Sequence, residues 1–343
     1  MARSPEKIDV HAHFLPSVYR EQCLANGYSS PDGYPNLPEW DLDAHLKMAD
    51  EMNITKSYLS ISSPGVHLVR GNDQLTRDLC RDCNIAGADI KKRYPERFGF
   101  FASLPLPDVG DSLKELSYVF DTLNADGIVV ETNFHGYYLG HRSFEPIWAE
   151  LNRRSAIVFI HPTTGCILKK DASSGEVCHK IDPLSEFPNP IFEFLFDTTR
   201  AVINLFYSGM IARYPNITYI VSHAGACLPP LIERFSLFGR RMPNVPVDES
   251  VTSAFVRERL RKQFYFDMAG VPWPDQLPAL LPLIGKDQVL YGSDYPFTKS
   301  ESVKSLGDMM EHFMPTVFTT EEEREMAYKR NAEKLFGTQS SGK

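Results

Sequence analysis

The chain opens on a strand-like stretch, residues 7–13, that reads KIDVHAH. Because a β-strand turns alternate residues to the same side, this pattern directs the imidazoles of His11 and His13 toward one place. Two converging imidazoles form half of a metal site. The motif is a weak indication on its own, because two surface histidines also fall at this spacing by chance.

Three later stretches repeat the arrangement, each an apolar run followed by a histidine or an aspartate. They read IVFIHP at residues 157–162, ITYIVSH at residues 217–223 and VLYGSDYP at residues 289–296. Each places one side chain, His161, His223 or Asp294, where a strand meets its loop. In a barrel of parallel strands these carboxyl ends converge on one mouth, where polar residues are typical of an active site. The four stretches together indicate one metal-binding mouth.

The order of the elements predicts an α/β fold, a (β/α)8 barrel. Strands that alternate with helices pair in parallel. Eight β-like runs lie near residues 7–13, 54–62, 98–104, 127–132, 156–161, 217–223, 264–268 and 288–293. Helices are predicted over residues 41–52, 73–94, 111–123, 144–153, 191–212, 250–262, 274–283 and 302–313, with a closing helix over 319–336.

Two long insertions follow strands that end in candidate metal ligands. Residues 14–40 follow the first strand and residues 163–190 follow the fifth. We expect both insertions to be irregular and to fold over the mouth as lids. Residues 337–343 are expected to be a disordered tail. No repeat or linker divides the chain, so one domain over residues 1–343 is predicted.

Composition excludes several classes of function. The chain has 343 residues and a net charge of -8, and its basic residues are scattered, which argues against nucleic-acid binding. No apolar run of about 18 residues and no leader peptide is present, so a cytosolic protein without a membrane partner is expected. The six cysteines show no regular framework, and we expect all of them to be free thiols. Cys80 and Cys83 have the spacing of half a zinc site, but they lie in a helical pattern without a second pair.

Three imidazoles and one carboxylate form the predicted metal ligands, His11, His13, His161 and Asp294. This donor set suits one divalent ion, Zn²⁺ by preference with Mn²⁺ as the alternative, and a catalytic site keeps one coordination position open. We place His223 beside this set as a carrier of protons, because an imidazole gains and loses a proton near neutral pH. The residues alone leave open the reverse assignment, with His223 as a ligand.

These motifs also resemble those of a known family. The His-x-His opening, VFIHP at 158–162, VSHAG at 221–225 and YGSDYPF at 291–297 are similar to the amidohydrolase superfamily, in the branch related to aminocarboxymuconate semialdehyde decarboxylase. Residues 131–148 and 264–281 resemble segments of fungal 6-methylsalicylate decarboxylases. The resemblance spans nearly the whole chain. It implies a barrel fold, a homodimer and the same site residues, with His11, His13, His161 and Asp294 as ligands and His223 as the catalytic histidine.

The resemblance implies a reaction, the non-oxidative decarboxylation of an ortho-hydroxy aromatic acid. The expected case is 6-methylsalicylate, which gives 3-methylphenol and CO₂. We hypothesise that the metal holds the acid through its phenol and carboxylate and stabilises charge as a Lewis acid, while Asp294 or His223 delivers a proton to the ring carbon.

The substrate-binding residues are predicted in two ways. The resemblance implies that Arg234 holds the substrate carboxylate, in some relatives across a dimer interface, although a lone helical arginine is more often solvated. Phe14, Trp273, Tyr295 and Phe297 lie next to strand ends and could flank a flat ring, although aromatic side chains there are more often packing.

Departures from the family leave alternatives. The strand at 127–132 has no lysine of the kind that bridges two metals in many hydrolytic members, which favours one metal. Glu131 and Asn133 either point into the mouth or cap their strand. The arginines of the aminocarboxymuconate enzyme have no counterpart near residues 40–52, so its substrate is not expected here. The rival functions are a metal-dependent hydrolase of a lactone or amide and a non-catalytic metal-binding barrel.

Overall fold

Eight parallel strands form the central sheet of the computed structural model, which describes residues 5–171 and 175–340. Their order around the sheet is β1-β2-β3-β4-β7-β10-β11-β12, the order of the chain. Bridges from Asp9 to Tyr291 and from Ala12 to Tyr295 join the first strand to the segment after the last one. The predicted barrel of parallel strands is therefore confirmed.

The observed strands agree with the predicted runs and are in several cases shorter. Their bounds are β1 (Lys7–His13), β2 (Ile54–Ser60), β3 (Phe98–Ala102), β4 (Gly127–Glu131), β7 (Ile157–His161), β10 (Thr218–Val221), β11 (Phe264–Asp267) and β12 (Val289–Leu290). Strands β10 and β12 end two and three residues before the predicted ends, and left-handed residues lie two and four positions beyond them. His223 and Asp294, which follow β10 and β12, have φ values of 54° and 58°.

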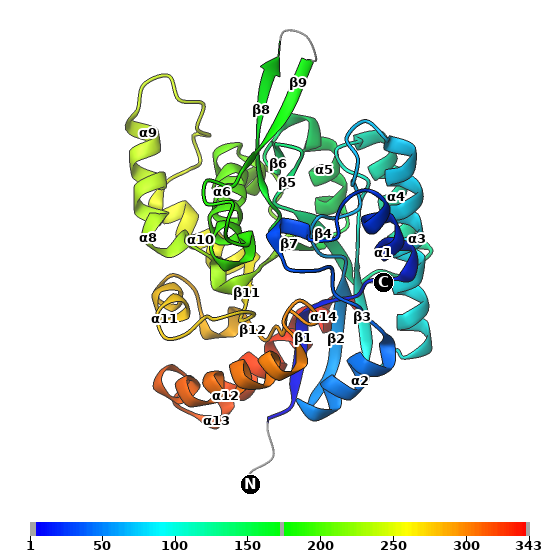
Figure 1. The fold of residues 1–343 in the computed structure, drawn as a ribbon. Helices are drawn as coiled ribbons and strands as arrows, with labels where there is room; N and C mark the ends of the chain where they lie inside the picture. The colour runs from blue at the N-terminus through cyan, green and yellow to red at the C-terminus, as the bar shows by residue number, and fades with distance from the viewer. Residues whose placement is uncertain (1–4, 172–174, 341–343) are drawn as a thin grey trace.

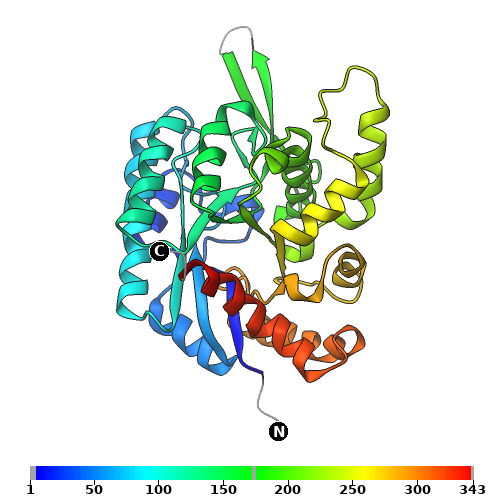
Figure 2. The ribbon, with the colours of Figure 1, turned by 180° about the vertical axis from the view of Figure 1, so that it is seen from behind.

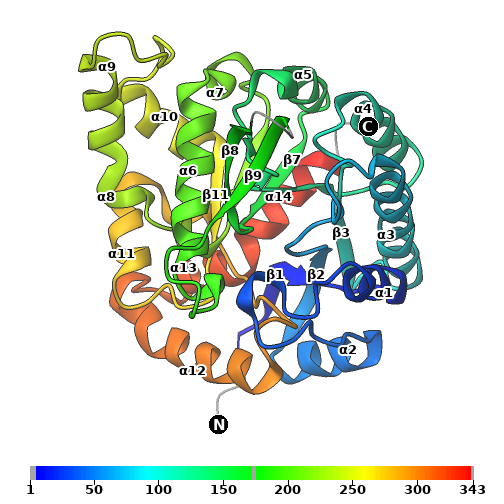
Figure 3. The ribbon, with the colours of Figure 1, turned by 45° about the horizontal axis from the view of Figure 1, so that its top comes forward.

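The helices surround the sheet (Figure 3). The main ones are α2 (Leu42–Glu51), α3 (Asp73–Arg93), α4 (Val109–Asp121), α5 (Glu145–Arg153), α6 (Glu193–Tyr207), α10 (Ser253–Gln263), α11 (Gln276–Leu280) and α12 (Ser300–Val317). Side chains of Asn72 and Asp108 cap the first turns of α3 and α4. The helix predicted over 191–212 is split into α6 and α7 (Met210–Arg213), because Gly209 adopts a left-handed conformation with φ 76°.

An apolar cluster fills the barrel below the mouth. Phe101, Val129, Phe159 and Ile220 belong to it and are almost fully buried. The chain ends with α13 (Glu321–Glu325), a π-helical turn and α14 (Asn331–Ser340), and α14 lies across the barrel end (Figure 2). The closing helix is thus confirmed. The predicted tail is wrong for residues 337–340, which continue α14, and residues 341–343 lie outside the described residues.

The two insertions contain regular structure, so their predicted irregularity is wrong in part. The first holds α1 (Ser17–Ala25) and the short η1 (Pro31–Gly33). In the second, β8 (Gly165–Asp171) pairs with β9 (Gly175–Ile181) in an antiparallel hairpin that projects beyond the barrel in Figure 1. The two insertions meet where η1 contacts η3 (Asn189–Ile191).

The prediction of six free thiols is also wrong. A disulfide joins Cys166 to Cys178 across the β8–β9 hairpin, where their Cα atoms lie 5.8 Å apart. Sequence spacing gave no sign of this pair, because only the strand register brings the two residues together. Cys80 and Cys83 are buried on α3, and the Cys80 thiol donates a hydrogen bond to the Ser103 carbonyl.

None of the described helices is long and apolar enough to cross a membrane.

The disulfide predicts the number of reactive thiols. Denatured protein, kept free of reductant, should react with Ellman's reagent at four cysteines, and reduction should raise the number to six. A Cys166→Ser variant should react at five without reductant, because Cys178 loses its partner. Six reactive thiols in the unreduced wild type would contradict the disulfide.

Candidate metal centre

Four metal-competent side chains converge at the mouth of the barrel. One ligand atom each from His11, His13, His161 and Asp294 lies within 4.8 Å of the others. The Nε2 atoms of His11 and His13 are 3.1 Å apart, and Asp294 Oδ1 lies 3.4 Å from the first and 3.2 Å from the second. The three histidines are almost fully buried. The structure therefore brings together the four residues that the sequence predicts as ligands.

Local backbone structure places these side chains. His11 and His13 share the inner side of β1 through the alternation of the strand. His161 is the last residue of β7. The amide of Asp294 donates a hydrogen bond of 2.8 Å to the carbonyl of His11, so the aspartate is tied directly to the strand that carries the histidines.

Groups behind the imidazoles orient them. The Nδ1 atom of His11 lies 3.0 Å from Asp267 Oδ2, and that of His13 lies 3.0 Å from the Ser60 hydroxyl and 3.3 Å from its carbonyl. With a hydrogen on Nδ1, each ring directs the lone pair of Nε2 at the cluster. His161 Nδ1 has a carboxylate oxygen of Glu131 at 3.5 Å. Three imidazole lone pairs beside one carboxylate fit a single divalent ion of the Zn²⁺ or Mn²⁺ type.

Electrostatics of the cluster favour a bound cation. Burial lowers the pKa of His13 and His161, which keeps both rings neutral and able to act as ligands. Burial would raise the pKa of Asp294, but hydrogen bonds from His11 and His13 hold it well below its usual range. For His11, burial is outweighed by the carboxylates of Asp267 and Asp294, which raise its pKa to about 10. The buried carboxylates thus hold positive charge at the position where a metal ion would replace a proton.

His223 lies beside the four and not among them. It begins the short η4 (His223–Gly225), and its ring centroid is 5.1 Å from that of His11. Its amide donates a hydrogen bond of 3.0 Å to Asp267 Oδ1. Among the described residues its buried Nδ1 atom has no hydrogen-bond partner, and burial lowers the pKa of the ring. This arrangement suits the predicted role in proton transfer.

A cavity of about 510 Å³ opens above the cluster, and its lining includes His161, His223 and Asp294. Its other walls are largely apolar and come from both insertions, from residues 191–195 at the start of α6, and from the loops after β11 and β12; they include Tyr34, Pro188, Ile191, Phe194, Val271 and Phe297. No lysine or arginine is among the described residues that line it. An acid bound here would therefore find its positive charge in a metal ion or in another subunit.

The predicted aromatic residues separate into two groups. Phe297 lines the cavity, and its ring centroid lies 5.5 Å from that of His13 and 5.9 Å from that of Tyr34. Phe14 is outside the cavity, because it follows His13 directly and points to the opposite side of β1, toward Gly87 of α3. Trp273 is also outside, buried and stacked on Phe313 of α12.

Arg234 does not line the cavity of its own chain. It lies after α8 (Leu228–Glu233), is exposed, and places its guanidinium 5.3 Å from the ring centroid of Phe238. Within one chain the structure therefore does not bring Arg234 to the candidate metal ligands.

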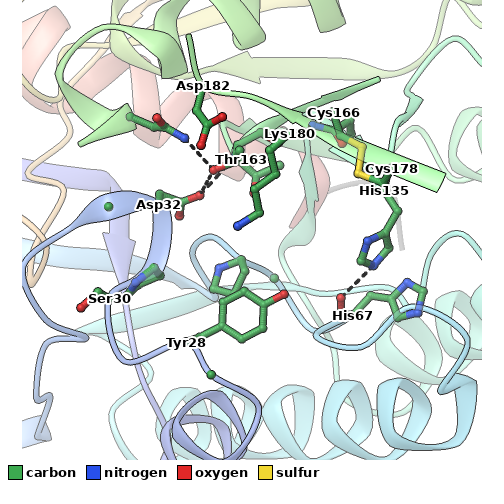
Figure 4. Close-up of a pocket in the computed structure, with 18 of the residues that line it drawn as sticks. Tyr28, Ser30, Asp32, His67, His135, Thr163, Cys166, Cys178, Lys180 and Asp182 are labelled. Atoms are coloured by element: carbon green, nitrogen blue, oxygen red, sulfur yellow. Dashed lines mark hydrogen bonds between the residues drawn. A yellow bond between two sulfur atoms is a disulfide. The ribbon is translucent and has the colours of Figure 1, made fainter. Parts of the chain in front are cut away.

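A second cavity of about 410 Å³ lies next to the first, and Pro31 and Asp32 line both. Figure 4 shows Lys180 pointing into it near Asp32, with the Cys166–Cys178 disulfide along one side. Asp32 accepts hydrogen bonds from the amide and hydroxyl of Thr164 and so joins the two insertions. These residues form a partition between the two cavities.

Sequence reasoning missed several residues of the site. Asp267 ends the apolar run FYFD at 264–267, the same pattern that identified His161, and so could have been found. Tyr34, whose hydroxyl donates to the Phe297 carbonyl at 2.5 Å, lies in an insertion where the sequence offers no such signal. The same holds for Gln276, whose amide donates to the carbonyl of His223.

Known proteins resemble this chain in sequence and in fold. A family model described as amidohydrolase matches residues 8–338. A 6-methylsalicylic acid decarboxylase from Penicillium expansum is 35% identical over 316 residues, which cover 90% of this chain and 90% of that protein. A crystal structure described as an amidohydrolase II has a TM-score of 0.83 and 32% identity, and the match covers 97% of this chain and 100% of that chain. A dihydroxybenzoic acid decarboxylase from a Polaromonas species, solved with manganese and 2-nitroresorcinol, has a TM-score of 0.77 and 21% identity over 97% of each chain.

The geometry predicts different metal contents for two histidine variants. His13→Ala should lower bound divalent metal well below one equivalent per chain, because it removes a donor from the cluster. His223→Ala should keep the metal content of the wild type, because its ring lies outside the four. Elemental analysis of the purified variants measures both. Loss of metal from His223→Ala would show that His223 is a ligand.

Proposed function

The chain belongs to the amidohydrolase family, and from this membership we propose that it decarboxylates 6-methylsalicylate, or a closely similar ortho-hydroxy aromatic acid, without oxidation. The products are 3-methylphenol and CO₂. The observation that carries the proposal is a His/Asp cluster, with His223 beside it, at the base of a largely apolar cavity of about 510 Å³. Its location is proposed to be the cytosol.

The proposed cofactor is one divalent ion held by His11, His13, His161 and Asp294. Zn²⁺ is our first choice and Mn²⁺ the alternative, because both accept imidazole and carboxylate donors. When bound, the ion supplies positive charge that attracts the oxygens of the acid and stabilises negative charge in the transition state.

The cavity walls orient the ring. Phe297, Phe194 and Ile191 offer apolar surface to a flat aromatic acid and its methyl group, and they exclude water around the carboxylate. Exclusion of water favours loss of CO₂, because a carboxylate that leaves bulk solvent is less stabilised by hydration.

Decarboxylation requires proton transfer to the ring carbon that bears the carboxylate. As that carbon gains the proton, the bond to the carboxylate breaks and CO₂ leaves. Asp294 is held ionised by His11 and His13, so it can donate only after it takes up a proton, for instance from the phenol of the substrate. His223 lines the same cavity, and among the described residues its buried Nδ1 atom has no hydrogen-bond partner. We assign the transfer to this pair, and solvent restores the proton after product release.

The alternative is a hydrolase of a lactone or amide that uses the same residues. In that reaction Asp294 would act as the general base toward a water molecule. The end of β4 carries Glu131 and no lysine to bridge a second metal, which favours the decarboxylase.

A direct assay tests the proposed reaction. The metal-loaded protein should convert 6-methylsalicylate to 3-methylphenol with release of CO₂, and a chelator should abolish the reaction. Salicylate and 2,6-dihydroxybenzoate serve as comparison substrates, and a lactone serves as the probe for hydrolysis. His223→Ala should lose about 10²–10⁴-fold in turnover, as expected for a group that transfers a proton. Absence of any phenol from protein with one equivalent of metal would contradict the proposal, and lactone opening would favour the hydrolase.

A homodimer that supplies Arg234 to the neighbouring site is the proposed assembly. The cavity has no cationic side chain among its described lining, and Arg234 is exposed. Near it, Leu237, Phe238 and Met242 are 45%, 51% and 50% exposed, which is apolar surface of the kind that a partner covers.

Mixing two inactive variants tests this assembly. Arg234→Ala and His223→Ala should each be inactive, because each homodimer lacks one essential group in both sites. If Arg234 acts across the interface, co-expressed mixed dimers contain one intact site, and about a quarter of the wild-type activity should return. If dimers shown to contain both variants recover no activity, a role of Arg234 across the interface is contradicted.

A further inference from the structure

Asp267 connects the candidate metal centre to the proton-transferring histidine. It is the last residue of β11 and is fully buried. Its Oδ2 atom lies 3.0 Å from Nδ1 of His11. Its Oδ1 atom accepts backbone hydrogen bonds of 3.0 Å from His223 and 3.0 Å from Ala269. The two oxygens therefore serve different parts of the site.

The two contacts of Asp267 stabilise the ring of His11 and the backbone of His223. The ring of His11 presents Nε2 to the cluster only if Nδ1 carries the hydrogen, and an acceptor at Oδ2 selects that tautomer. The backbone of His223 is in the left-handed region with φ 54°, which costs energy for a residue other than glycine. The hydrogen bond from its amide to Oδ1 offsets part of that cost. It also fixes the backbone position from which the imidazole ring extends.

The close approach of Asp267 and His11 is itself built into the fold. Gly292 lies between them, and a Cβ atom at this position would come within 2.7 Å of the Cβ atom of His11 and 3.3 Å of that of Asp267. Only the absence of a side chain at residue 292 leaves the two side chains room to meet.

We propose that Asp267 is a positioning residue that fixes the tautomer of His11 through one oxygen and the backbone of His223 through the other. The proposal rests on the metal-dependent function proposed above. It assigns one carboxylate, which is neither a candidate ligand nor part of the cavity lining, to the control of both metal affinity and proton transfer.

The variant Asp267→Asn separates the two roles. Two backbone N–H groups face Oδ1, so the amide must keep its oxygen there and turn its NH₂ group toward His11. His11 then has a donor opposite Nδ1 and must carry its own hydrogen on Nε2, where the lone pair for the metal should be. Metal affinity, measured by competition with a chromogenic chelator, should fall about 10- to 100-fold.

A matched control uses the other buried aspartate of the region, Asp9. It is equally inaccessible, but it accepts from the backbone amides of His11 and Ser293 and from the Ser293 hydroxyl, and not from an imidazole. In Asp9→Asn the oxygen can keep both amides, and the hydroxyl of Ser293 can accept from the new NH₂ group. Metal affinity should stay within about threefold of the wild type, because no ligand tautomer changes. An equal loss of affinity in both variants would show a general effect of buried amides and overturn the proposal.

A spectroscopic measurement tests directly which nitrogen of His11 carries the hydrogen. In ¹⁵N-histidine-labelled wild type, NMR should show a hydrogen on Nδ1 of His11, assigned by its loss in His11→Gln. In Asp267→Asn the hydrogen should move to Nε2. A wild-type His11 without a hydrogen on Nδ1, or a variant that keeps that hydrogen, would overturn the role toward the ring, whether or not the protein decarboxylates any acid.

The role toward His223 is tested with excess metal. Asp267→Asn keeps the Oδ1 contacts, so saturating metal should restore its turnover to within about tenfold of the wild type. Asp267→Ala loses both contacts, and saturating metal should not restore it. Equal recovery of the two variants would overturn this half of the proposal and leave the metal-affinity result standing.

Discussion

A short ladder of backbone hydrogen bonds between β1 and the segment after β12 determines the rest of the site. The amides of Val10 and His13 donate to the carbonyls of Tyr291 and Tyr295, and the amide of Asp294 donates to the carbonyl of His11. The ladder closes the ring of strands. It also sets the first strand, with two imidazoles, against the last segment, with one carboxylate. Closure of the barrel therefore also brings His11 and His13 to Asp294.

Several carboxyl groups are buried around this ladder. Asp9, Asp267 and Glu131 lie within the barrel mouth close to Asp294, and the first two are fully buried. Burial of several carboxylates is costly unless positive charge or hydrogen bonds compensate. Backbone amides and the Ser293 hydroxyl satisfy Asp9, and His11 satisfies Asp267. A cation at the four-residue cluster would compensate the charge of Asp294 and of Asp267 behind His11, whose pKa values are held low by the neighbouring histidines.

The sequence predicts the strands and the converging residues well, because both follow from local pattern. Apolar runs mark strands, and the carboxyl ends of parallel strands share one edge. The pattern alone therefore predicts that His161 and Asp294 lie at that edge. The direction in which a single side chain points is harder to predict. Phe14 and Phe297 both adjoin strand ends, yet alternation along β1 turns the first toward α3 and only the second lines the cavity. Cys166 and Cys178 meet through hairpin register, which composition and spacing do not encode.

The partition at Asp32 has a consequence for how substrate range can evolve. Pro31 and Asp32 separate two chambers of similar size, and the hydrogen bonds from Thr164 hold this thin wall in place. A small residue at either position would open a passage between the chambers without altering any strand of the barrel. One or two substitutions in the wall would therefore give a longer substrate access to space that the fold already contains, without an insertion.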